Sequence, residues 1–206
     1  MDNLLHIDAS PRSIRSISRQ LATEFIIQYK RHNEVRIHYR DLGHNPVPLI
    51  TEPWIEGAYT PSSQHSEAAK EAIAVSDALV DEFLLSSAYI ISTPMYNLTI
   101  PASLKAYIDQ IVRVNRTFES KRDGTYAPLV HDKKMLIITS RGNEYGNHDP
   151  LGNYDYLEPY LKTIFGFIGI KDIIFVDCEG IGLGVDIRKK AFDKTHKELA
   201  QLAKTW

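Results

Sequence analysis

The sequence predicts a doubly wound α/β domain, in which helices cover both faces of a parallel sheet of five strands. Short apolar runs alternate along the chain with longer segments whose apolar residues recur at helical spacing. Four of the five short runs are almost continuously apolar, which is typical of parallel strands buried on both faces. This pattern leaves the order of the strands open, because two orders, one of five and one of six strands, are compatible with it.

The predicted elements alternate regularly from an opening strand to a closing helix. The expected strands are residues 4–9, 35–39, 88–93, 135–139 and 173–177. The expected helices are residues 19–31, 66–85, 101–114, 151–168 and 187–204. Pro101 suits the first turn of the third helix. Residues 40–63 and 115–132 show no regular pattern, and irregular stretches of this length are usually functional or flexible.

Composition narrows the class of protein. With 206 residues, the chain is expected to form one domain over 1–206. Its 43% hydrophobic and 24% charged residues exclude a wholly disordered or fibrous chain. The net charge of −2 argues against a nucleic-acid partner. The chain starts without a signal-peptide pattern and holds no apolar stretch of about 18 residues, so we expect a cytoplasmic protein without a membrane partner.

Cysteine and histidine usage argues against disulfides and metals. Cys178 is the only cysteine, which excludes a disulfide framework and suits a buried structural thiol. The eight histidines show no paired spacing with carboxylates, so no metal site is expected. Gly180, Gly182 and Gly184 have the spacing G-x-G-x-G rather than that of a dinucleotide motif, and we expect a flexible connection there.

A hydroxyl-rich loop follows the first expected strand and leads into the first helix. It carries the serines Ser10, Ser13, Ser16 and Ser18, together with three arginines. The N-terminus of a helix offers unpaired backbone N–H groups and a partial positive charge, which favour a phosphate. The loop has no glycine, so it is neither a G-x-G-x-x-G motif nor a P-loop. We expect phosphate binding, with simple capping of the helix as the alternative.

The third strand is followed by residues suited to a flat ring. Pro94 stiffens the turn, and Met95 and Tyr96 offer polarizable and aromatic surface. Asn97 can donate and accept hydrogen bonds at a ring edge. The alternative is that Met95 and Tyr96 belong to the core, and local sequence does not decide between the two.

The fourth strand ends in a turn that would let a ligand approach the backbone closely. It reads Ser140, Arg141, Gly142 and Asn143. Gly142 has no side chain to block the approach, and backbone N–H groups there would hold a ring carbonyl or a developing negative charge. An ordinary turn is the alternative interpretation.

Together these loops resemble those of the FMN-dependent NADH oxidoreductases that reduce azo compounds and quinones, the azoreductases. The resemblance covers about residues 4–199. Its most specific motifs are Pro94-Met95-Tyr96-Asn97 and Thr139-Ser140-Arg141-Gly142. The other matching segments are Ser10, Ser16-Ile17-Ser18, Asp41-Leu42, Asn45-Pro46-Val47-Pro48, Leu104-Lys105-Ala106-Tyr107-Ile108-Asp109, Pro159-Tyr160-Leu161, Gly166-Phe167-Ile168-Gly169-Ile170 and Glu179-Gly180.

The resemblance implies a flavodoxin-like fold with strand order 2-1-3-4-5 and FMN bound at the first and third strands. The residues that would hold the FMN phosphate are Ser10, Ser16, Ile17 and Ser18. The residues that would frame the isoalloxazine ring are Met95, Tyr96, Asn97, Leu98, Ser140, Arg141, Gly142 and Asn143. Leu98 replaces the usual Phe, which removes an aromatic wall, and Asn143 replaces a usual Gly.

The resemblance also implies how the reaction proceeds. NADH would deliver a hydride to FMN and leave, and a quinone or aromatic azo compound would take its place and accept two electrons, which gives ping-pong kinetics. The flavin performs the redox step, so no catalytic side chain is required. Water would protonate the product, with Tyr96, Tyr145 and His148 as candidate donors.

A homodimer is a further implication, with residues of the partner completing each pocket. Phe118 is a candidate pocket wall or, alternatively, an anchor within its own loop. Trp54, Ile55 and Tyr59 are candidates to cover the dimer seam or the pocket mouth.

Two other classes remain open. The first is a flavodoxin-type electron carrier without its own small-molecule acceptor. Such carriers are usually strongly acidic, whereas the net charge of −2 and two long loops favour the enzyme. The second is a regulatory nucleotide-binding domain without redox chemistry, which would bind no flavin. Fold analogy alone does not decide function, so the loop motifs carry more weight than the fold.

Overall fold

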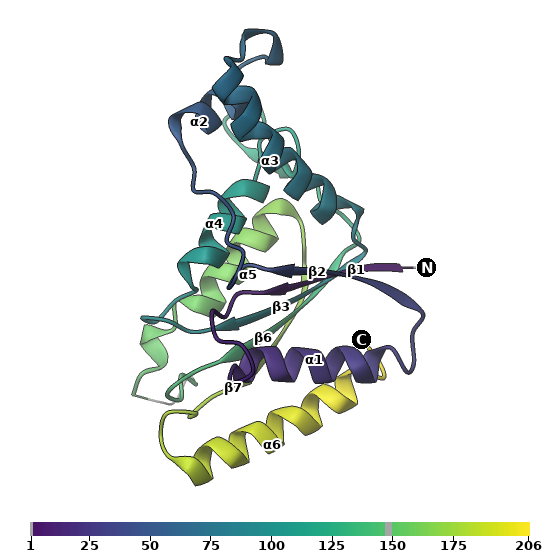
Figure 1. The fold of residues 1–206 in the computed structure, drawn as a ribbon, viewed down its shortest axis with the longest axis vertical. Coiled ribbons are helices and arrows are strands. Elements are labelled where there is room, and N and C mark those ends of the chain that lie inside the picture. The colour runs from purple at the N-terminus through teal and green to yellow at the C-terminus, as the bar shows by residue number, and fades with distance from the viewer. Residues whose placement is uncertain (1, 147–149) are drawn as a thin grey trace.

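The computed structural model describes residues 2–146 and 150–206. Within these residues, five parallel strands form one sheet in the order β2-β1-β3-β6-β7 (Figure 1). The strands are β1 (Asp2–Asp8), β2 (Val35–Asp41), β3 (Ala88–Pro94), β6 (Lys134–Ser140) and β7 (Asp172–Cys178). Because β4 and β5 form a separate hairpin, this is the predicted order 2-1-3-4-5, which is confirmed.

Helices form a layer on each face of the sheet (Figure 1). The helices α1 (Ile17–Tyr29) and α6 (Val185–Leu202) cover one face and share an apolar core with it. The helices α3 (Glu67–Leu85), α4 (Ala102–Ile111) and α5 (Leu157–Ile168) cover the other. None of the helices in the described chain is both long enough and apolar enough to cross a bilayer.

The ends of the helices follow local chemistry. Ser16 caps α1 and Ser66 caps α3, and each side chain accepts a hydrogen bond from a backbone N–H of the first turn. Gly169 ends α5 with a φ of 117°, a left-handed conformation that favours glycine. A Cβ there would lie only 2.1 Å from the carbonyl oxygen of Val130, so no other residue fits.

The two stretches without a predicted pattern contain short elements. Helix α2 (Glu52–Tyr59) lies in the first, followed by a 3₁₀ turn at Ser62–Gln64. The hairpin of β4 (Phe118–Ser120) and β5 (Tyr126–Pro128) lies in the second. The expectation of irregular structure was wrong for these segments. The helix expected from residue 151 begins at 157, behind a 3₁₀ turn at Gly152–Tyr154.

The register of the sheet brings three loops to one edge. Asp8 on β1 lies opposite Ser92 on β3, and Pro94 on β3 lies opposite Ser140 on β6. Ser140 in turn lies opposite Cys178, the last residue of β7. The loops that leave these strands therefore start side by side, at the edge where doubly wound sheets bind their ligands.

Candidate functional site

A cavity of about 460 Å³ lies at this edge, between the loops after β1, β3, β6 and β7. Its volume falls within the range of roughly 300–1,000 Å³ that is typical of ligand sites. The predicted site residues that line it are Ser10, Ser16, Ile17, Met95, Tyr96, Ser140 and Gly142. The residues that the predicted site did not include are Arg12, Arg15, Pro94, Ile181, Gly182 and Arg188.

The serine loop is built around the start of α1. Ser16 stands at the N-cap, and its hydroxyl accepts from the N–H of Arg19 at 3.5 Å. The buried Ser10 hydroxyl accepts from the N–H of Arg12 at 3.2 Å. The first turn of the helix thus points its N–H groups and the positive end of its dipole toward the cavity rim. This end of the cavity is suited to an anion.

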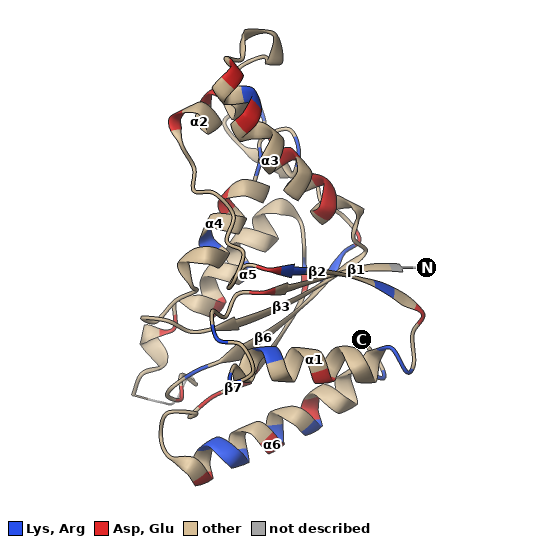
Figure 2. Ribbon diagram, in the orientation of Figure 1, with Lys and Arg blue, Asp and Glu red and all other residues tan. Residues whose placement is uncertain are grey.

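Arginine side chains add positive charge to the same cavity. Arg12 and Arg15 come from the serine loop and Arg188 from the first turn of α6. Figure 2 shows Lys and Arg gathered at the entry to α1 and on the first turns of α6. Arg188 donates through Nε to the carbonyl of Ile181 at 2.9 Å, which fixes its stem beside the cavity. The rim therefore attracts a phosphate from two elements that are far apart in sequence.

The loop after β3 is a tight hairpin turn. Tyr96 and Thr99 exchange two backbone hydrogen bonds of 2.9 and 3.1 Å. Asn97 and Leu98 between them have φ angles of 49° and 72°, the geometry of a type I′ turn. The carbonyl of Leu98 also accepts from the N–H of Tyr156 at 3.0 Å. The turn is thus held in place and presents Tyr96 to the cavity.

The loop after β6 is tied to the glycine segment after β7. The N–H groups of Gly180, Ile181 and Gly182 donate to the carbonyls of Asn143, Arg141 and Gly142 at 3.1, 3.1 and 2.8 Å. Ile181 and Gly182 also line the cavity, so the segment expected to be a flexible connection forms part of the cavity wall. Among the described residues, the N–H groups of Gly142 and Asn143 have no protein acceptor, so they are free to donate to a ligand.

Arg141 serves a different purpose from the one expected for it. Its side chain is only 2% exposed and does not line the cavity. Nη1 donates to Asp155 at 2.7 Å, and Nε donates to Thr139 at 2.9 Å. Nη2 lies 3.0 Å from an Asp177 oxygen but not in a hydrogen-bonding direction, so this contact is an ion pair alone. The side chain joins β6, β7 and the segment before α5, and only its backbone faces the ligand loops.

The remaining predicted residues lie around the cavity rather than on its wall. Ser18 is fully buried, with its hydroxyl 3.4 Å from that of Ser16. Asn97 lines a neighbouring cavity, and Leu98 and Asn143 act through their backbones. Tyr145 does not line the cavity, and its N–H donates to Glu179 at 3.1 Å. His148 lies outside the described residues.

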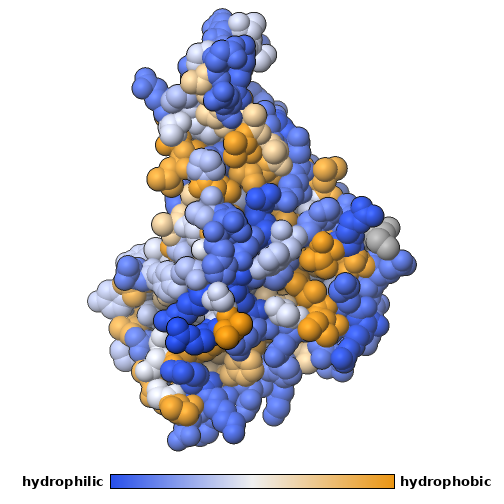
Figure 3. Space-filling view, viewed as in Figure 1, coloured by the Kyte–Doolittle hydropathy of each residue, from blue (hydrophilic) through white to orange (hydrophobic). Residues whose placement is uncertain are grey.

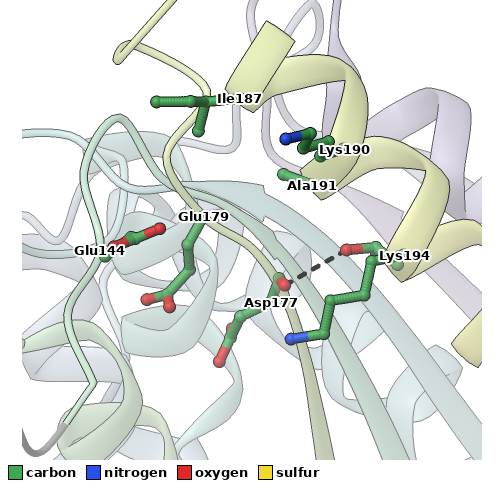
Figure 4. Close-up of a pocket in the computed structure, with 8 residues that line it drawn as sticks. Glu144, Asp177, Glu179, Ile187, Lys190, Ala191 and Lys194 are labelled. Carbon is green, nitrogen blue, oxygen red and sulfur yellow. Dashed lines mark hydrogen bonds between the residues drawn. The ribbon is translucent and has the colours of Figure 1, made fainter.

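A second cavity, of about 410 Å³, lies between the end of β7 and α6 (Figure 4). The charged residues that line it are Glu144, Asp177, Glu179, Lys190 and Lys194. Burial raises the pKa of Asp177 above its ordinary value, against the opposing effect of Arg141. Carboxylates at this wall make it a poor place for a phosphate, and none of the predicted binding residues lines it.

A third cavity, of about 650 Å³, adjoins the first at Tyr96. Apart from Tyr96, its lining residues are Asn97, Thr99, Ile100, Pro101, Ala102, Lys105 and Tyr160. The lining is mostly apolar, which suits a flat hydrophobic molecule. Because Tyr96 belongs to both cavities, a molecule in the third lies beside the ligand of the first.

The residues expected at a dimer seam divide into two groups. Trp54 is buried, and its Nε1 donates to Gln110 at 2.8 Å, so it anchors α2 within its own chain. Ile55 and Tyr59 are exposed by 50% and 68%. Figure 3 shows an apolar patch over α2 and its surroundings, in the upper part of the molecule.

The ring of Phe118 packs within its own chain, 4.9 Å from that of Phe167 and tilted by 55°, as the anchor alternative requires.

The first cavity has the features that a phosphorylated flat ring requires. Its anion-binding end is formed by the serine loop, a helix N-terminus and three arginines. Its other end holds Met95 and Tyr96 beside the open Gly142, where a Cβ would meet no atom within 4 Å. These are the groups that a flavin mononucleotide would contact through its phosphate and its ring.

Comparisons with known proteins agree with this geometry. A family described by a flavodoxin-like fold matches residues 2–203. Over the whole length of both chains, the sequence is 47% identical to an FMN-dependent NADH:quinone oxidoreductase of Trichormus variabilis. It is 38% identical, again over both full chains, to an FMN-dependent NAD(P)H:quinone oxidoreductase of Pseudomonas aeruginosa.

Solved structures give the same result. An azoreductase of Bacillus anthracis superposes with a TM-score of 0.92 over the whole of both chains, at 26% identity. An FMN-dependent NADH-azoreductase of the same species, solved in complex with FMN, superposes with a TM-score of 0.86 over 98% of this chain and all of the other, at 25% identity.

Proposed function

The chain belongs to the family with a flavodoxin-like fold that includes the FMN-dependent NADH:quinone oxidoreductases, and we propose that it is an enzyme of this kind. It reduces quinones and aromatic azo compounds with electrons from NADH. The observation that carries the proposal is the cavity at the strand ends, where a phosphate-binding loop and a ring-binding surface belong to one site. The relatives' names and the fit of the cavity support FMN as the cofactor.

We propose that the serine loop holds the phosphate of FMN. Ser10, Ser16 and Ile17 line the cavity at the start of α1, and Ser18 supports the Ser16 hydroxyl from behind. Arg12 and Arg15 neutralise the phosphate charge, and Arg188 joins them from α6. A dianion at this place gains from the helix dipole and from charge-assisted hydrogen bonds.

The ring of FMN is assigned to the surface between the hairpin turn and the loop after β6. Met95, Tyr96, Asn97 and Leu98 form the first side, and Ser140, Arg141, Gly142 and Asn143 form the second. The N–H groups of Gly142 and Asn143, which have no acceptor among the described residues, are available to stabilise negative charge on a ring carbonyl. Arg141 contributes through its backbone and through the ion pairs that fix the loop.

Bound FMN supplies the two-electron redox chemistry, and the protein supplies binding, orientation and electrostatics. The apolar cavity beside Tyr96 provides space for one further flat molecule. We therefore propose that NADH and the acceptor occupy this space in turn, which gives ping-pong kinetics. No catalytic side chain is assigned, because the cavity is open to water that can protonate the product.

The test is a spectrum of the FMN-loaded protein recorded without oxygen. Addition of NADH is expected to bleach the flavin absorbance, and addition of a benzoquinone is expected to restore it without any partner protein. Plots of reciprocal rate against reciprocal NADH concentration at several quinone concentrations are expected to be parallel.

Three outcomes contradict the proposal at different levels. Failure to bind FMN overturns the assignment of the whole site. Binding of FMN without bleaching by NADH favours an electron carrier that depends on a separate reductase. Intersecting lines in the reciprocal plots are compatible with the assignment as an enzyme but exclude ping-pong kinetics.

We also propose that the protein, acting as one domain over residues 1–206, is a homodimer. The exposed apolar side chains Ile55 and Tyr59 on α2 support this, since contiguous apolar surface commonly marks an interface. Light scattering is expected to give twice the mass of one chain. The variant Ile55→Glu is expected to shift the mass toward the monomer, and a wild-type mass of one chain would refute the dimer.

A further inference from the structure

A buried ion network lies behind the serine loop, on the side away from the cavity. We propose that Arg19 and Asp41 are positioning residues, which set the serine loop in the shape that receives the flavin phosphate without touching the phosphate. This inference rests on the proposed function. It gives a role to the Asp41-Leu42 segment, which the proposed function leaves without one.

Arg19 holds the backbone of Ser10 from behind. Its Nε and Nη2 both donate to the Ser10 carbonyl oxygen, at 3.0 and 2.6 Å. Arg19 does not line the flavin cavity, so the carbonyl is directed away from it. A carbonyl oxygen that turned toward the cavity would repel a phosphate. By holding it back, Arg19 leaves the cavity-facing side of Ser10 to groups that attract an anion.

Two carboxylates fix the Arg19 side chain. Asp8 lies 3.0 Å from Nη1, and Asp41 accepts from Nη1 at 2.9 Å and from Nη2. Tyr39 donates to Asp8 at 2.8 Å and accepts from Nη1 at 2.8 Å. Because the guanidinium is rigid and planar, acceptors on several sides allow it one orientation. The direction of the Ser10 carbonyl is thereby set by the ends of β1 and β2.

Asp41 also supports a second contact with the loop. It is 2.7 Å from Nδ1 of His44, and its other oxygen accepts from the N–H groups of Gly43 and His44 at 3.1 Å each. The Nε2 of His44 lies 3.2 Å from the hydroxyl of Ser13. Asp41 therefore anchors the loop at two points, through Arg19 to Ser10 and through His44 to Ser13.

The packing around Gly43 shows how tightly the Ser10 carbonyl is enclosed. A Cβ on Gly43 would lie 1.9 Å from the Ser10 oxygen and 2.7 Å from Nη2 of Arg19. The first of these atoms is backbone and cannot move without moving the loop. The carbonyl, the guanidinium and the turn after β2 therefore form one close-packed unit.

The deciding experiment compares FMN with riboflavin, which has the same ring but no phosphate. Dissociation constants for both are measured by quenching of flavin fluorescence. Arg19→Met is expected to raise the constant for FMN at least tenfold and to change that for riboflavin less than twofold. A general loss of structure would weaken both flavins alike, so the ratio of the two constants separates positioning from mere stability.

Two milder variants keep the test decisive if Arg19→Met does not fold. Arg19→Lys retains the charge but not the fork of donors, and an intermediate loss of FMN affinity is expected. His44→Ala changes a half-exposed side chain and removes its contacts with Ser13 and Asp41, but it leaves the bonds from Arg19 to the Ser10 carbonyl. A smaller loss of about threefold is therefore expected, for FMN alone. The matched control is Arg40→Met on β2, beside Asp41, which breaks the ion pair with Glu82 (2.6 Å) and is expected to leave the ratio unchanged.

The outcomes distinguish the inference from the proposed function. If the wild type binds neither flavin, the proposed function fails and the inference fails with it. If the wild type binds both flavins and the Arg19 and His44 variants keep the wild-type ratio, the inference alone is refuted. A change in the ratio caused equally by Arg40→Met would also refute it, because the effect would then belong to any ion pair of β2.

Discussion

Some of the predicted site residues hold the loops in shape and do not face the cavity themselves. Arg141 belongs to the most specific motif of the sequence, yet its side chain is buried among carboxylates and only its backbone reaches the site. Arg188 lines the cavity although no local motif marks it, and Ile181 and Gly182 line it although their glycine-rich segment was expected to be a flexible connection. Their contribution depends on the packing of α6 beside α1, which is a long-range property that the residues around them do not encode.

The turn at Asn97 illustrates a requirement at the scale of one residue. Its φ of 49° lies in the left-handed region, which Asn and Gly tolerate and other side chains enter at a cost of roughly 1–2 kcal/mol. Asn97→Ala is expected to lower the free energy of unfolding by about 1 kcal/mol. Asn97→Gly, the matched control, is expected to lie within about 0.5 kcal/mol of wild type. Urea unfolding measures both, and equal losses in the two variants would show that the backbone angle is not the cause.

At the scale of elements, the regular part of the fold was predictable and the short elements were not. The long helices carry an apolar period, and most of the strands are continuous apolar runs. The structure confirms all ten of these elements within a few residues of the expected ends, apart from the late start of α5. Helix α2 was not predicted because its sequence contains Pro53 and Gly57, which usually indicate a loop. Pro53 instead occupies the first turn, and Gly57 lets α2 approach Ile73 of α3, where a Cβ would lie 2.8 Å away.

The hairpin of β4 and β5 was missed for a different reason. Its strands span only three residues each, too few for a period to show. A signal was present in Asp123-Gly124, since this dipeptide favours tight turns, and Gly124 has a φ of 82°. Its packing against α5 through Phe118 and Phe167 supplies the stability that so short a hairpin lacks.

We predict that stability depends on pH because of two carboxylates, Asp8 at the end of β1 and Asp41 at the end of β2. Burial by itself would raise the pKa values of Asp8 and Asp41, but hydrogen bonds from His6 to Asp8 and from Arg19 and His44 to Asp41 outweigh it, and both pKa values are lowered. Both carboxylates are therefore ionised in folded and unfolded chains above the ordinary Asp range. As the pH falls through that range, the unfolded chain takes up protons first, so the free energy of unfolding decreases.

Asp41→Asn tests this directly. The variant is expected to be less stable than wild type at pH 7 and to lose less stability between about pH 5 and pH 2, because one of the two coupled carboxylates is gone. Urea unfolding at a series of pH values measures the slope. Asp193→Asn, on the exposed face of α6, is the control and should keep the wild-type slope. An unchanged slope in Asp41→Asn would show that the ion network does not govern acid stability.

At the scale of the whole molecule, the site exists because the topology brings separate loops together. The serine loop, the hairpin turn after β3 and the loop after β6 are far apart in sequence and meet because β1, β3 and β6 are neighbours in register. The sequence could predict these loops from their hydroxyl, aromatic and glycine residues. It could not show which of these site residues face the cavity. That depends on the tertiary contacts that bury the side chains of Arg141 and Ser18 in the protein interior.

If FMN occupies the cavity between the serine loop and Gly142, a bulky side chain at Gly142 must exclude it. A side chain on Gly142 would enter open space, so Gly142→Leu is expected to fold with an unchanged melting temperature. Gly166, on the exposed face of α5, is equally open, and Gly166→Leu is the matched control. We predict that titration with FMN, followed by fluorescence, shows binding to wild type and Gly166→Leu and none to Gly142→Leu. Undiminished binding of FMN to a folded Gly142→Leu protein would show that the flavin binds elsewhere on the molecule.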